Sequence, residues 1–92
     1  MQREGTLHIV WLNRNRIDPV YSVGFADYAS SGGAMKLKTV NGSHELIGFL
    51  SKNIRVHADI VNSALKGLQE EGNASIFNVI LSDDQLYSLG LK

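Results

Sequence analysis

The three histidines are the residues most able to do chemistry by themselves, and they lie at positions 8, 44 and 57. No two of them have the spacing of paired metal ligands, such as HxH or HxxxH. His8 falls in a strand-like run, while His44 and His57 each fall at the start of an expected helix. This spacing favours surface or capping histidines. We therefore expect no metal site and no cofactor.

A serine nucleophile would need a base and a turn that exposes it. Ser30 or Ser31 with His8 and Asp27 contains the right groups, but no strained elbow motif presents either serine. The small, glycine-rich run over 30–33 precedes a strand, whereas a phosphate-binding loop precedes a helix N-terminus. We interpret this run as a hairpin loop.

Carboxylates and thiols give no catalytic arrangement either. The pairs Glu70–Glu71 and Asp83–Asp84 are adjacent in helices, so their side chains point in different directions. Asp83 and Asp84 are better explained as acids in the first turn of a helix, where the positive end of the helix dipole stabilises their negative charge. The chain has no cysteine, which removes disulfides, thiolate zinc sites and a cysteine nucleophile. We expect a protein that is not an enzyme.

Basic residues remain as candidates for a contact surface. The formal net charge is zero, whereas dedicated nucleic-acid binders usually carry a basic excess. Seven of the nine basic residues nevertheless fall in the first 55 positions. Lysines and aromatics on an exposed sheet face bind single-stranded nucleic acid by charge and stacking. The candidate contact residues are Arg14, Arg16, Lys36, Lys38, Arg55 and Lys66.

A second indication of nucleic-acid binding comes from the segment 45–76. A helix, a tight connection, a second helix and a strand follow one another there, and Val61 to Gly72 reads VNSALKGLQEEG. The segment resembles the second half of a winged-helix domain, and that resemblance implies a DNA-recognition helix. Two features depart from the family: strands precede the segment, and the second helix offers Lys66 as its one basic residue, where phosphate contacts need several.

Three strands are expected to position the N-terminal residues. Thr6–Asn13 is nearly all apolar, which is typical of a central strand buried on both faces. Val20–Tyr28 places Tyr21, Val23 and Phe25 on one face and small residues on the other, where a glycine at position 24 could mark a bulge.

The third strand is expected over Ala34–Val40, where apolar residues and lysines alternate. We expect Met35, Leu37 and Thr39 to point inward and the two lysines to point outward. Outward lysines are typical of an exposed edge strand that must avoid pairing with other chains.

The second half has clearer boundaries. Ser82 and Gln85 match a capping box, and Gly90 matches the left-handed position after a helix end. Gly67 is unfavourable in a helix, and we expect it to permit close packing. The expected elements are a helix from an N-cap at Ser43 to Lys52, a helix over 57–71 with one apolar face, a strand over 75–81 and a short helix after Ser82.

These elements predict one small domain over 1–92 of the α+β class. The order is βββααβα, and the apolar first and fourth strands are expected to pair. The sheet is then mostly antiparallel with strand order 4-1-2-3, and the two longer helices cover one face in a two-layer sandwich. No apolar run approaches the roughly 20 residues of a membrane span, so we expect a cytoplasmic protein with no membrane partner.

The sequence predicts a function only in outline. We expect a small non-enzymatic domain that acts through protein contacts and associates with itself. The expected contact surfaces are the edge over Met35–Val40 and the acidic side of the helices. The alternative is a nucleic-acid-binding regulatory domain that uses the 44–72 helix pair and the basic residues of the N-terminal half.

Overall fold

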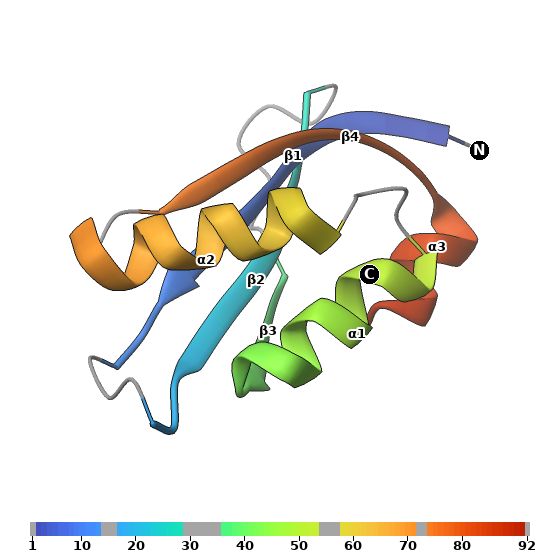
Figure 1. Ribbon diagram of the computed structural model, residues 1–92. Helices are drawn as coiled ribbons and strands as arrows, with labels where there is room; N and C mark the ends of the chain where they lie inside the picture. The colour runs from blue at the N-terminus through green and yellow to red at the C-terminus, as the bar shows by residue number, and fades with distance from the viewer. Residues whose placement is uncertain (1, 14–16, 29–35, 54–57, 72–73, 92) are drawn as a thin grey trace.

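The fold is a four-stranded antiparallel sheet with helices on one face (Figure 1). The computed structural model describes residues 2–13, 17–28, 36–53, 58–71 and 74–91. The strand order β3-β2-β1-β4 is the predicted order 4-1-2-3 read from the other edge, so the predicted α+β sandwich is confirmed. The elements are β1 (Gln2–Trp11), β2 (Val20–Asp27), β3 (Leu37–Asn41), α1 (Ser43–Asn53), α2 (Ala58–Glu71), β4 (Ser75–Ser82) and α3 (Asp83–Ser88).

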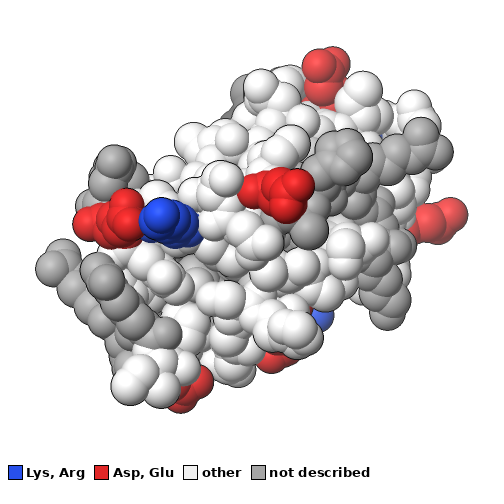
Figure 2. Space-filling view, viewed as in Figure 1, with Lys and Arg blue, Asp and Glu red and all other residues white. Residues whose placement is uncertain are grey.

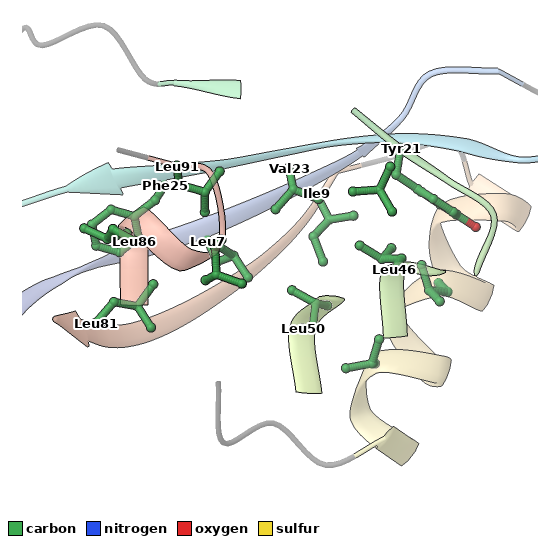
Figure 3. Packing of buried hydrophobic residues seen from close by; sticks show 14 of the residues in the cluster. Leu7, Ile9, Tyr21, Val23, Phe25, Leu46, Leu50, Leu81, Leu86 and Leu91 are labelled. Carbon is green, nitrogen blue, oxygen red and sulfur yellow. The ribbon is translucent and has the colours of Figure 1, made fainter. Parts of the chain in front are cut away.

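The core lies between the sheet and the helices, as the alternation of side chains along a strand requires. In Figure 3, Leu46 and Leu50 point from α1 toward Ile9 and Val23 of the sheet. Leu50 and Leu65, which the predicted helix layer required to be buried, are 1% and 4% exposed. The buried set is Leu7, Ile9, Tyr21, Val23, Phe25, Val40, Leu46, Leu50, Val61, Leu65, Leu68, Leu81, Leu86, Leu89 and Leu91.

The predicted orientation of β3 is wrong by one residue. Val40 pairs with Tyr21 and is buried with it, whereas Leu37 and Thr39 lie on the opposite face and are exposed. Lys38 therefore points to the helix side, where its Nζ lies 5.0 Å from the centre of the Phe49 ring. A long lysine stem can cover apolar surface while its charged end stays in water, so the helix side tolerates it.

Two further expectations about the first strands are wrong. β1 is central but is not buried on both faces, because no described helix covers the second face. Gly24 does not mark a bulge, because the pairing of β1 with β2 runs without interruption from Gly5–Asp27 to Trp11–Tyr21.

The start of α1 also differs from the prediction. Gly42 accepts the first helical hydrogen bond from the Leu46 amide and has a φ of +87°, so it takes the capping position expected for Ser43. The Ser43 hydroxyl instead lies 2.9 Å from the buried Tyr21 hydroxyl, to which the Gln69 amide also donates at 3.1 Å. This polar contact joins β2 to both longer helices and satisfies a buried hydroxyl.

The capping predictions for α3 are confirmed. Ser82 accepts from the Gln85 amide, and the Gln85 side chain accepts from the Ser82 amide. At the other end Gly90 has a φ of +75°, the Leu91 amide donates to the Leu86 carbonyl, and Leu86 and Leu91 are both buried. This is a Schellman motif with its apolar contact, and it returns the chain to the core.

Arg3 joins the ends of three elements, a role that its sequence context did not indicate. Its guanidinium donates to Asp27 at 2.8 Å and to Asp83 at 2.9 Å. The hydrogen bond to Asp27, followed by that to Asp83, raises the pKa of Arg3 above its ordinary value. The arginine's stabilising contribution is therefore fully present in the neutral range, and it declines as the pH rises through this raised pKa.

Gly48 and Gly67 give a stability prediction because neither is needed for packing. A Cβ built on either glycine meets no atom within 4 Å, so the close packing expected at Gly67 is absent. We expect Gly48→Ala and Gly67→Ala each to stabilise the protein by about 1 kcal/mol, because alanine restricts the unfolded chain and favours a helix. Urea unfolding at low protein concentration measures the gain.

Gly42→Ala is the matched control for these two substitutions. It also meets no atom within 4 Å, but its φ of +87° is left-handed, so we expect a loss of about 1–2 kcal/mol. Equal effects of all three substitutions would contradict this conformational explanation.

Candidate functional site

The face of the sheet opposite the helices is the candidate site. Even-numbered residues of β1 and β4 point to it, because odd-numbered residues such as Leu7 and Leu81 point into the core. All the described helices lie on the other side (Figure 1). We call the set that follows the open face, and its residues are Gln2, Glu4, Thr6, His8, Val10, Leu12, Val20, Ser22, Gly24, Ala26, Tyr28, Leu37, Thr39, Asn41, Ile76, Asn78, Ile80 and Ser82.

Large apolar side chains on the open face are strongly exposed. Two of them, Ile76 and Ile80, lie on β4 at the sheet border, with 56% and 61% of their surface in water. Leu12 and Val10 extend the exposed apolar surface to β1, and Leu37 lies on β3 at the far border. On β1 the cross-strand neighbours of Ile76 and Ile80 are His8 and Glu4, so the two isoleucines line the β4 border of this face and do not merge with Leu37 on β3. Large apolar side chains exposed together on one border of a small domain are typical of a contact site.

Polar groups on the open face are largely paired with one another. Thr6 Oγ1 and His8 Nε2 lie 2.7 Å apart, and the Tyr28 hydroxyl donates to Asn78 Oδ1 at 2.7 Å. The second contact crosses β1 and ties the end of β2 to the middle of β4. The open face can therefore bury apolar surface while these polar groups keep partners.

Half of the predicted basic contact residues can be located. Arg14, Arg16 and Arg55 lie outside the described residues. Lys36 is exposed just before β3, and Lys66 is exposed on α2. Because α2 lies over β1 and β4, Lys66 belongs to the opposite border of the sheet from β3.

Lys38, the third candidate lysine that can be located, points from β3 to the helix side of the sheet. Its Nζ lies 3.6 Å from the position of a Cβ on Gly90, which places the ammonium group beside the C-terminal end of α3. A cation at a helix C-terminus is electrostatically favourable, so Lys38 has a structural explanation.

The helix-covered side has a mixed and sparse charge. Figure 2 shows scattered acidic side chains, few basic ones and mostly uncharged surface in the part that is described. On α2 the outward residues include Asp59, Lys66 and Glu70, so the described part of this helix is not a basic recognition helix. The helix pair packs on a four-stranded sheet, which is not the winged-helix arrangement.

The described histidines and acidic residues do not form a metal-binding group. His8 is half-buried beside Thr6, His44 is exposed at the start of α1, and His57 lies outside the described residues. Within the described ranges, no three histidine, aspartate or glutamate side chains lie close enough to hold a metal ion.

No described helix has the length and apolar character needed to cross a membrane.

The fold defines the chain as a small two-layer α+β domain in which no described helix covers the second face of the sheet. A scan against protein-family models and searches of curated proteins and of solved structures found no match for the chain.

Sequence reasoning missed the open face, although a signal for it was present. The apolar run of β1 predicts a strand buried on both faces, and the equally apolar run of β4 predicts a central or well-covered strand. However, the pattern βββααβα supplies only two long helices, and both are used on the same face. The apolar residues Ile76 and Ile80 on the other face of β4 are therefore left exposed by the described helices.

Proposed function

We propose that this protein is a non-enzymatic contact domain that associates with a second copy of itself through the β4 border of its sheet, where Ile76 and Ile80 are exposed. The observation that carries the proposal is the exposure of Ile76 and Ile80 on β4, the strand at one border of the sheet. Burying each isoleucine removes apolar surface from water, which favours association. Obligate and self-associating interfaces are the more apolar class of protein interfaces.

The test is the dependence of molecular mass on protein concentration, measured by sedimentation or light scattering. We expect a dimer that dissociates on dilution. The double variant Ile76→Thr/Ile80→Thr keeps β-branched residues in the strand but loses apolar contact, and we expect its dissociation constant to rise about tenfold or more. The matched control is Ile60→Thr on α2, which is 50% exposed on the other side of the molecule and should leave the constant unchanged.

A wild-type chain that remains monomeric at hundreds of micromolar would contradict self-association. Equal effects of the β4 and α2 variants would contradict the choice of surface. Nucleic-acid binding, the alternative function, predicts binding at low salt that weakens steeply as salt is added. We expect no such binding, because Lys66 on α2 lies over β1 and β4, toward the border of the sheet opposite Lys36 and Lys38.

A further inference from the structure

We infer that two copies join edge to edge through β4, antiparallel and centred on Asn78, so that the two sheets form one continuous sheet. This inference rests on the proposed self-association and specifies its interface. β4 is at the end of the sheet order, and its only described strand neighbour is β1. One side of its backbone is therefore available for pairing in the described structure.

The register with β1 identifies which backbone groups face outward. Tyr28 donates to the Glu4 carbonyl and Leu12 to the Val20 carbonyl, so even-numbered residues of β1 bond to β2. Hydrogen-bonding direction alternates along an antiparallel strand, so odd-numbered residues of β1 bond to β4. Their partners on β4 are also odd-numbered. The N–H and C=O groups of Ile76, Asn78 and Ile80 consequently point to the free edge.

These outward-pointing N–H and C=O groups can form hydrogen bonds with the same groups of β4 in a second copy. With Asn78 opposite Asn78 of the second copy, Ile76 lies opposite Ile80 and Ile80 opposite Ile76. Each of these three residue pairs is a hydrogen-bonded pair, in which the two residues exchange two backbone hydrogen bonds. On the open face isoleucines then meet isoleucines across the interface, and on the helix side Phe77 meets Val79. This reciprocity is what a twofold-symmetric interface requires.

The composition of the two edges favours β4 over β3. β4 is an eight-residue strand, SIFNVILS, with no charge, proline or glycine. β3 has five residues and carries Lys38, with Lys36 just before it, so self-pairing would bring lysines together. Short strands and lysines are how proteins protect an edge from pairing. β4 has no charged side chain that could bind a charged partner, whereas a second copy presents the same uncharged strand and the same outward-pointing backbone groups.

The chain contains no cysteine, so single cysteines can report the register directly. In a hydrogen-bonded antiparallel pair the Cα atoms lie about 5.5 Å apart, within the range that a disulfide spans. We expect Asn78→Cys to form a disulfide-linked dimer under mild oxidation at least about tenfold faster than Thr39→Cys on β3, because pairing raises the local thiol concentration. Ile76→Cys alone and Ile80→Cys alone should be slow, but an equimolar mixture should cross-link as the 76–80 heterodimer.

The outcomes separate this inference from the proposed function. A dimer in solution with slow cross-linking at position 78, or with fast Ile76→Cys self-linking, would overturn the β4 register and leave self-association standing. A monomer at all concentrations would overturn both. The Ile76→Cys and Ile80→Cys mixture keeps the test decisive even if Asn78→Cys loses stability with the Tyr28 contact, because both isoleucines are exposed and lack that contact.

Discussion

Gly5→Ala should destabilise the protein by about 3 kcal/mol or more, at the upper end of what overpacking costs. A Cβ built on Gly5 would lie 2.2 Å from the Ala26 carbonyl oxygen and 2.6 Å from the Phe25 ring. The carbonyl belongs to the backbone of β2, so β1 and β2 would have to separate. Because these strands are the two central strands of the sheet, the strain would fall on the middle of the domain.

Urea unfolding of the variant, at a concentration where the chain is monomeric, measures this loss. Gly48→Ala is the control, because the same added methyl meets open space and should stabilise the protein. Phe25→Leu removes the ring but leaves the Ala26 carbonyl in place. We therefore expect Gly5→Ala to destabilise the Phe25→Leu protein less than it destabilises the wild type, but still to destabilise it. Near-wild-type stability of Gly5→Ala would show that β1 and β2 do not approach as closely as described.

Leu50→Ala should cost about 2–5 kcal/mol, the usual range for emptying a buried leucine site. Leu50 is 1% exposed and points from α1 toward the centre of the sheet (Figure 3). The loss combines the transfer of the side chain from water with the cavity left behind. For a domain of this size the loss is a large part of the total stability.

The control for Leu50→Ala is Leu37→Ala, which removes the same atoms from a side chain that is 60% exposed on the open face. We expect Leu37→Ala to change the free energy of unfolding by less than about 0.5 kcal/mol. Leu50→Met keeps the side-chain volume and should cost less than about 1.5 kcal/mol. If chemical denaturation gave similar losses for Leu50→Ala and Leu37→Ala, the assignment of the core face would be wrong.

Local signals were enough to determine most of the elements. The capping box at Ser82 and the left-handed Gly90 are set by hydrogen bonds within a few residues, and both are confirmed. The apolar repeats likewise predicted both longer helices to within a residue or two of the observed ends. The pairing of the first and fourth strands followed from their shared apolar character and is also confirmed.

Tertiary structure alone decided how those elements face one another. The register that places Val40 opposite Tyr21 turned Lys38 toward Phe49 and left Leu37 in water, a one-residue shift that reverses every side chain of β3. The tertiary structure also brought Arg3 to Asp27 and Asp83, residues that are far apart in the chain. The apolar residues of β1 and β4 indicate strands, but their spacing does not say whether anything covers both faces. That depends on where the helices pack, and here they leave Ile76 and Ile80 exposed.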